Sequence, residues 1–147
     1  MKPTSWKGEE RIDLVVQRKS GANEPWVFAT ELKWWRQSDG ANAANRRMAL
    51  VVDLLRAACA RGFFGVEEEA YVVLISTEAS WKKTTTTTGS DSVVCTKLNA
   101  TGTQSWSLKA IRTAPSLKGA VAQLRSSIEI PSSFHTTLVQ HQSALPR

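Results

Sequence analysis

Two carboxylates and a lysine stand where a β-hairpin would bring them together. Asp13 lies in an alternating segment at residues 11–18. Glu31 and Lys33 lie in a second alternating segment at residues 26–35. Successive strand residues point to opposite faces, so Glu31 and Lys33 share one face, and an antiparallel partner adds Asp13 to it. Such a set can bind a divalent cation and stabilise negative charge, as metal-assisted hydrolysis of a phosphodiester requires.

The same alternation assigns the other face of this hairpin. Leu32 and Trp34 lie opposite the charged side chains, and we expect them in the hydrophobic core. Gly, Asn and Pro in residues 20–25 supply the turn between the strands. Trp35 shares the face of Lys33. Packing under a neighbouring helix is its favoured interpretation, and stacking on a base or sugar is the alternative.

A family pattern resembles this arrangement. Ile12 and Asp13, then seventeen residues, then Glu31-Leu32-Lys33 resemble the signature of the PD-(D/E)XK nuclease superfamily. The resemblance covers roughly residues 9–76 and includes the family order of acidic motif, Glu-x-Lys strand, helix and strand. It implies an α/β fold with a restriction-endonuclease-like core, in which a mixed β-sheet with an antiparallel hairpin is flanked by helices. It also implies a metal-dependent endonuclease that cuts nucleic acid, with DNA preferred over RNA by family habit.

The resemblance also implies a role for each residue of the motif. Asp13, Glu31 and Lys33 would be the catalytic residues. Asp13, Glu31 and the backbone carbonyl of Leu32 would hold Mg²⁺ or Mn²⁺, which prefer oxygen ligands. Lys33 would orient the attacking water or stabilise the negative charge that develops.

Two observations weigh against this interpretation. Many family members add a glutamate from a helix well upstream of the first strand, and Glu9 and Glu10 are too close to the strand for that role. In addition, Glu-x-Lys occurs by chance in many sequences, and an exposed cluster of opposite charges is a common solvated face.

Helical periodicity follows the hairpin. Apolar residues between positions 48 and 59 predict a helix over residues 41–61 with one apolar face. Arg46 and Arg47 lie in its first turns, where positive charge opposes the helix dipole. A phosphate contact near the metal is one interpretation of these arginines, and ordinary pairing is the other.

Two further features complete the predicted core. Asp53 and Arg56 are most simply a solvated face of the same helix. The apolar, β-branched run at residues 71–75 predicts a central strand covered on both faces.

Residues 77–147 are interpreted as a variable elaboration of one domain that spans residues 1–147. Lys82 and Lys83 precede a threonine-rich stretch at residues 84–88, which predicts a loop, and these lysines are candidates for holding a nucleic-acid strand. Short strands are predicted at residues 93–98, 106–111 and 128–130, and a helix at residues 115–126. No chemistry is assigned to His135 or His141, and the two cysteines have no zinc-ligand spacing.

Composition limits the partners and the location. The net charge is +6, and residues 101–147 hold five Lys and Arg against one acidic residue, which favours phosphate contacts there. A merely soluble basic surface is the alternative. No apolar stretch is long enough to span a membrane, and the N-terminus has no hydrophobic signal region, so a cytoplasmic location is expected.

Two other functions remain open. One is a catalytically inactive nuclease-fold module for nucleic-acid or protein binding. The other is the toxin nuclease domain of a larger effector, neutralised by an immunity protein. Many nucleases of this kind form homodimers, although no dimer seam stands out in the sequence.

Overall fold

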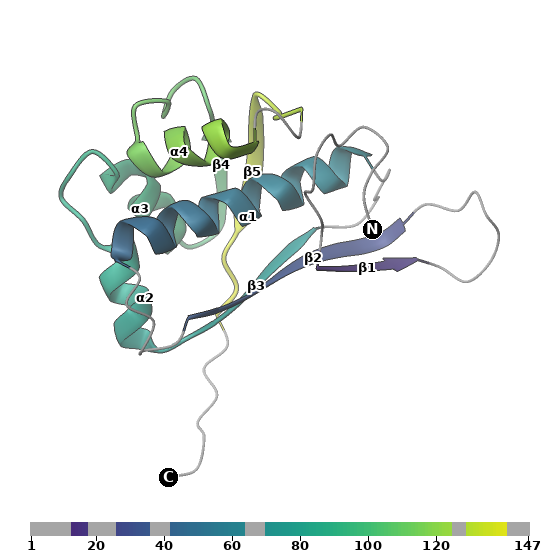
Figure 1. Ribbon diagram of the computed structural model, residues 1–147, viewed down its shortest axis with the longest axis horizontal. Coiled ribbons are helices and arrows are strands. Elements are labelled where there is room, and N and C mark those ends of the chain that lie inside the picture. Colours follow the sequence, from purple (N-terminus) through teal and green to yellow (C-terminus); the bar gives the residue numbers. More distant parts are fainter. Residues whose placement is uncertain (1–12, 18–25, 36–41, 64–69, 125–128, 141–147) are drawn as a thin grey trace, which may run out of the picture.

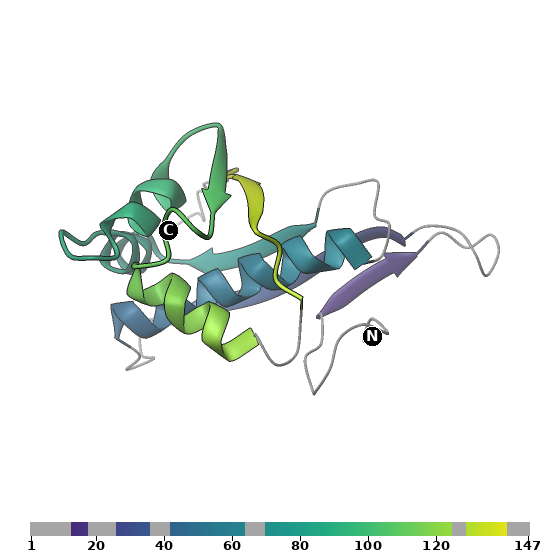
Figure 2. The same ribbon diagram turned by 90° about the horizontal axis from the view of Figure 1, so that it is seen from above.

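A long helix lies across one face of a small sheet in the computed structural model, which describes residues 13–17, 26–35, 42–63, 70–124 and 129–140 (Figure 1). Viewed from above, this helix, α1 (Ala43–Phe63), runs over the sheet and lies beside a shorter helix, α4 (Pro115–Leu124) (Figure 2). The sheet therefore has helical cover on one side, and this arrangement decides which side chains of the sheet are buried.

The predicted hairpin is present. Strands β1 (Leu14–Gln17) and β2 (Trp26–Trp35) pair antiparallel, with Leu14 opposite Thr30. The predicted strand start at residue 11 and the turn at residues 20–25 lie outside the described residues. Asp13 directly precedes β1. Because Leu14 pairs with Thr30, Asp13 lies beside the Glu-x-Lys segment of β2.

The predicted helix and the strand that follows it are confirmed. Asn42 caps α1 by accepting a hydrogen bond from the backbone amide of Asn45 at 2.8 Å. After α1, strand β3 (Tyr71–Ser76) pairs parallel to β2, which gives the order β1-β2-β3. Parallel neighbours need a long crossover connection, and α1 provides it. The chain thus has a mixed α/β fold, while a restriction-endonuclease-like core stays a prediction.

The expected double cover of β3 is wrong for the described residues. β3 is the last strand in the order of its sheet, and Tyr71, Val73 and Ile75 are exposed on the face away from α1. Val72 and Leu74 face the other way and pack against the hydrophobic cluster. An apolar run identifies a strand without showing how many of its faces are covered.

The C-terminal half departs further from the predictions. The threonine-rich stretch at residues 84–88 was expected to be a loop. This is wrong for Thr84 and Thr85, which are buried in a helix, whereas residues 86–88 lie outside the helices and strands. Residues 93–98 form a helix in place of the predicted strand. The helix predicted at residues 115–126 is present as α4. The elements between β3 and α4 are α2 (Glu78–Thr85), α3 (Ser92–Asn99) and β4 (Thr103–Ser107).

The C-terminal half also contains a second sheet of two antiparallel strands. The strand predicted at residues 106–111 begins earlier, as β4, and ends at Ser107. Its partner, β5 (Ser133–Thr137), was not predicted. Of the strand predicted at residues 128–130, residue 128 lies outside the described residues, and residues 129–130 are not part of a strand. Trp106 of β4 stacks on Phe134 of β5 at 5.3 Å between ring centroids.

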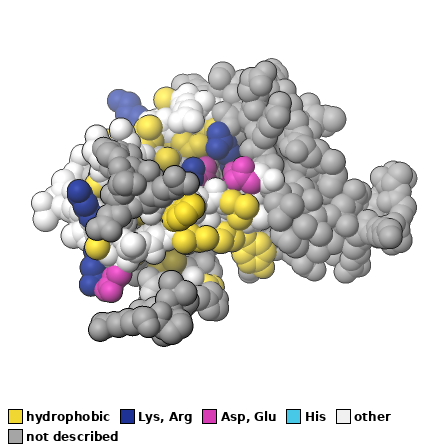
Figure 3. Space-filling view, turned by 60° about the horizontal axis from the view of Figure 1, so that its bottom comes forward, with side chains coloured by type: hydrophobic (Ala, Val, Ile, Leu, Met, Phe, Trp, Pro, Cys, Tyr) yellow, Lys and Arg dark blue, Asp and Glu magenta, His cyan; other side chains and the backbone are white. Residues whose placement is uncertain are grey.

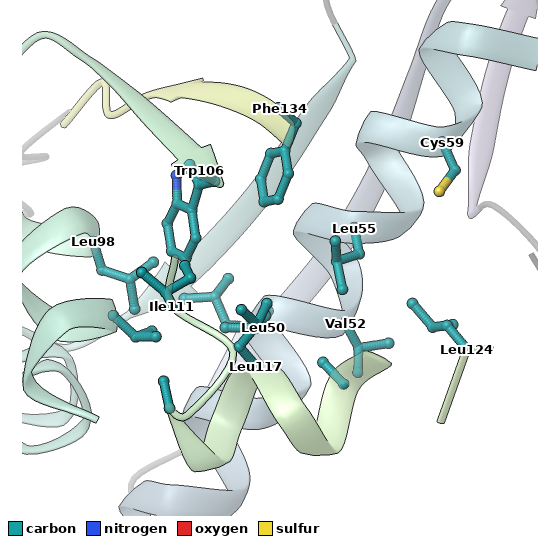
Figure 4. Packing of buried hydrophobic residues seen from close by; sticks show 14 of the residues in the cluster. Leu50, Val52, Leu55, Cys59, Leu98, Trp106, Ile111, Leu117, Leu124 and Phe134 are labelled. Atoms are coloured by element: carbon teal, nitrogen blue, oxygen red, sulfur yellow. The ribbon is translucent and has the colours of Figure 1, made fainter. Parts of the chain in front are cut away.

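One hydrophobic cluster joins the two halves of the chain. Side chains of α1 pack against α4 and against the pair Trp106 and Phe134 (Figure 4). The helices approach closely at Gly119, where an added Cβ atom would lie 2.5 Å from the sulfur of Met48. Cys59 is buried in this cluster, as expected. Within the described residues, none of the helices has the length and apolar character needed to cross a membrane.

Candidate active site

Pairing of β1 with β2 fixes the first carboxylate. The backbone amide of Leu32 donates a hydrogen bond of 2.8 Å to Oδ2 of Asp13. Asp13 itself is exposed. The hairpin therefore brings Asp13 beside the Glu-x-Lys segment, as the sequence predicts, and leaves one side of this carboxylate open to solvent.

The two faces of β2 are reversed relative to the expected core. Glu31 is only 3% exposed and Trp35 is buried, and both lie on the side of α1. Leu32 and Trp34, which we expected in the core, are exposed on the outer face. That expectation is wrong because alternation identifies two faces but does not show which one meets the helix.

Trp35 packs under a neighbouring helix, which is the interpretation that the sequence favours. Its ring stacks on Trp81 of α2 with centroids 6.1 Å apart, and the guanidinium of Arg46 lies 6.0 Å from the ring. Trp35 is thus packed under helices and only 5% exposed, which leaves too little surface for stacking on a base.

A third carboxylate enters the cluster from α1. Lys33 Nζ lies 2.8 Å from Oδ2 of Asp53, whose side chain is only 2% exposed. Arg56, one turn further along, donates to Oδ1 of the same carboxylate at 3.3 Å. The prediction of a solvated helix face is therefore wrong for Asp53. We define the acidic cluster as Asp13, Glu31 and Asp53.

Sequence reasoning missed Asp53, although a signal for it exists. Arg46, Leu50, Asp53 and Ala57 follow at spacings of four, three and four residues, which places them on one stripe of α1. All four are buried, so α1 is covered on more than its obvious apolar face. A second stripe that combines charged and apolar residues at helical spacing is compatible with a buried ion pair, and the structure shows one at Asp53.

Burial and crowding hold a proton in the cluster. Burial, the nearby carboxylates of Asp53 and Asp13, and a side-chain hydrogen bond with Asp13 together raise the pKa of Glu31 to about 8, although Arg56 opposes them. Burial also raises the pKa of Asp53 above its ordinary value, although Lys33 and Arg56 lower it. Oε1 of Glu31 is buried without a hydrogen-bond partner. A buried carboxylate oxygen without a donor needs a proton or a cation.

A divalent cation fits these residues by the chemistry of the donor set. Asp13 is open to solvent, Glu31 has an unpaired oxygen, and the hydrogen bond of Leu32 keeps Asp13 at the motif. Two carboxylates and a backbone carbonyl are ligands of the kind that Mg²⁺ takes. Among the described residues, no group of three or more His, Cys, Asp and Glu side chains is placed to enclose a metal ion. Any cation held here would therefore keep several waters.

The four candidate nucleic-acid contacts have different surroundings. Arg47 is buried, and it donates to Oδ2 of Asp91 at 3.0 Å and to the carbonyl of Thr84 at 2.5 Å. Arg46 is buried beside Trp35. Lys82 and Lys83 are exposed on α2, and Lys82 pairs with Glu78 at 2.7 Å. Only the two lysines offer surface to a phosphate, and binding by any of the four stays a prediction.

Comparison of the chain with protein-family models, with curated proteins and with solved structures found no match. The functional interpretation therefore rests on the geometry of the acidic cluster and on the motif that the chain resembles.

Proposed function

We propose that this chain is a divalent-metal-dependent nuclease that hydrolyses phosphodiester bonds, with DNA as the first substrate to test. The observation that carries the proposal is the unpaired, buried Oε1 of Glu31 beside Asp13 and across from the Lys33–Asp53 pair. A surface cluster of opposite charges would leave its carboxylates hydrated and at ordinary pKa. This cluster buries Glu31 and Asp53, at a cost that a cation bound by Glu31 and the exposed Asp13 would offset.

Each residue of the site has a separate role in the proposed reaction. Asp13, Glu31 and the carbonyl of Leu32 would hold Mg²⁺ or Mn²⁺. The ion would lower the pKa of a water and polarise the scissile phosphate. Lys33 is about one third exposed, so its ammonium group can meet a phosphoryl oxygen while Asp53 restrains it.

Asp53 and Arg56 act through Lys33 in this proposal. Asp53 fixes the position of the ammonium group at 2.8 Å, and Arg56 balances part of the negative charge at Asp53. The charge at Lys33 is therefore oriented before substrate arrives, which lowers the reorganisation needed during the reaction.

The deciding experiment is a cleavage assay on supercoiled plasmid, single-stranded DNA and structured RNA. It uses Mg²⁺ and Mn²⁺ with an EDTA control, and compares the unmodified chain with Asp13→Asn, Glu31→Gln and Lys33→Met. We expect metal-dependent cutting that falls at least about a hundredfold in each variant. Glu78→Gln, which changes an exposed carboxylate of α2, is the matched control and should cut normally. Cutting that survives in all three site variants would disprove the assignment.

Calorimetry separates this proposal from a nuclease-fold module without turnover. The enzyme should bind Mg²⁺ or Mn²⁺, and Glu31→Gln should weaken that binding. A chain that binds nucleic acid equally well in EDTA, binds neither metal and never cuts would instead be a binding module.

A further inference from the structure

The outer face of the three-stranded sheet is apolar and exposed. We define the outer sheet face by five side chains on the side of β2 and β3 away from α1. Figure 3 shows hydrophobic side chains gathered on this side, next to acidic and basic ones. The face consists of Leu32 (55% exposed), Trp34 (61%), Tyr71 (48%), Val73 (45%) and Ile75 (63%).

Strand register makes these side chains one continuous surface. In the parallel pairing of β2 with β3, Leu32 stands beside Val73 and Trp34 stands beside Ile75. β3 is apolar on its inner side as well, where Val72 and Leu74 pack against the hydrophobic cluster. A strand that is apolar on both faces is typical of a sheet with cover on both sides. The outer sheet face is therefore built to be covered.

We propose that the outer sheet face is covered by a second copy of this chain, in a two-fold symmetric dimer that packs sheet against sheet. The exposed area of the five side chains is on the order of 500 Å². Two copies would bury roughly 1,000 Å² through these side chains alone, which is where specific interfaces begin, before any polar rim is added. Two flat pleated faces pack about 10 Å apart, as in a β-sandwich.

Charge favours the same occupant. None of the five positions carries a charged side chain, although the chain has a net charge of +6. A nucleic-acid backbone needs cations, and the outer sheet face offers none. Two like-charged copies can meet through an uncharged face, and each residue then finds an apolar counterpart in the symmetric interface.

The dimer leaves the acidic cluster free. Glu31 and Lys33 point toward α1, on the opposite side of the sheet from Leu32 and Trp34. Association through the outer sheet face therefore does not cover Glu31 or Lys33. Dimerisation is measured without a nuclease assay, so it is tested separately from the nuclease proposal.

Sedimentation velocity of the full chain across a wide concentration range tests the dimer. We expect reversible dimerisation, and Val73→Glu should raise the dimer dissociation constant by about a hundredfold, because the symmetric interface would bury two like charges. Val73→Thr keeps the shape of the side chain and should weaken the dimer less. Val93→Glu, at an exposed apolar position on α3, is the matched control and should dimerise normally.

Circular dichroism must show that the Val73→Glu monomer keeps its fold. A wild-type chain that stays monomeric at all concentrations would overturn the proposal. The partner of the outer sheet face would then be a different protein. A dimer that persists unchanged in Val73→Glu would also overturn it, because association would then use another surface. Equal loss of the dimer in Val93→Glu would indicate non-specific association and would have the same consequence.

Discussion

The residue with the most consequence for the proposed chemistry is Asp53. Its side chain is buried and pairs with the cationic side chains of Lys33 and Arg56. It also lies near enough to Glu31 to raise the pKa of that residue. A carboxylate in this position both restrains Lys33 and keeps negative charge close to the proposed metal ligands. Its two effects can be separated by experiment.

For Asp53→Asn, we predict a fall in kcat of about tenfold to a hundredfold with little change in KM, because Lys33 loses its anchor while the substrate contacts remain. Asp53→Glu keeps the charge and should recover part of the loss. Steady-state cleavage kinetics give both constants. Unchanged kcat in Asp53→Asn would show that Lys33 is positioned without it.

The pKa of Glu31 predicts how stability depends on pH. Its pKa is about 8 in the fold and 4.5 ordinarily, so the folded state holds a proton that the unfolded chain releases. The contribution of Glu31 is therefore largest below pH 4.5 and is lost as the pH rises toward 8. The free energy of unfolding in EDTA should fall across this range. Glu31→Gln should flatten the decline, while the raised pKa of Asp53 leaves a smaller slope.

Urea unfolding at a series of pH values measures this slope. The matched control is Glu78→Gln. Lys82 lowers the pKa of this exposed carboxylate, so its contribution to stability grows as the pH rises, and its loss should not flatten the decline. An equal slope in Glu31→Gln and the unmodified chain would contradict the assignment of the proton to Glu31.

At the scale of elements, a buried polar contact holds the helices together. Asp91, at the start of α3, accepts from Arg47 of α1 at 3.0 Å. Its other oxygen accepts from the backbone amide of Ser116 at 2.9 Å and from the hydroxyl of Ser116 at 2.8 Å, which caps α4. Arg47 also donates to the last turn of α2 through Thr84. One carboxylate and one guanidinium thus connect four helices.

We predict that Asp91→Ala lowers the free energy of unfolding by about 3–5 kcal/mol, because it leaves Arg47 buried without a counter-charge and removes the cap of α4. Asp91→Asn should lose less, since an amide oxygen can still accept from Ser116. Chemical denaturation measures both. The exposed pair of Glu78 and Lys82 is the comparison, and Glu78→Ala should have little effect. Equal effects at the two sites would contradict a structural role for Asp91.

Elements differ in how far sequence predicts them. α1 was predictable because its helical period extends over many residues, and β3 because residues 71–75 form an apolar, β-branched run. α3 was missed because Val93 and Val94 favour a strand, whereas its buried residues Val94, Cys95 and Leu98 have helical spacing. α2 was missed because threonines read as a loop, yet Asn99 fixes its end by donating to the carbonyl of Thr85 at 2.8 Å.

The candidate site was predictable in part for a similar reason. Strand parity places Asp13, Glu31 and Lys33 together without knowledge of the rest of the chain. The position of Asp53 opposite Lys33, and the choice of which face of β2 is buried, depend on how α1 crosses the sheet. That crossing is set by contacts between distant segments, which a single sequence does not encode locally.

At the scale of the whole molecule, a cation that binds only the folded state should stabilise it. We predict that Mg²⁺ or Mn²⁺ at a hundredfold excess over Kd adds about 2.7 kcal/mol to the free energy of unfolding and raises Tm by several degrees. EDTA should reverse the rise. Glu31→Gln should show a much smaller shift, and an equal shift in this variant would place the ion elsewhere.

The inverted faces of β2 give the chain a conflict between folding and function. A slip of β2 by one residue would bury Leu32 and Trp34 under α1 and expose Glu31, Lys33 and Trp35 to water. The apolar side chains gained outnumber the one lost, so the hydrophobic effect favours the slip. The hydrogen bond from Leu32 to Asp13 and the ion pair of Lys33 with Asp53 oppose that slip. The folding energy landscape is therefore locally frustrated at the proposed active site, because hydrophobic burial and the polar contacts favour different registers of β2. The charged residues specify the register that chemistry needs, and replacing them all with apolar residues would favour a competing fold of the same sheet.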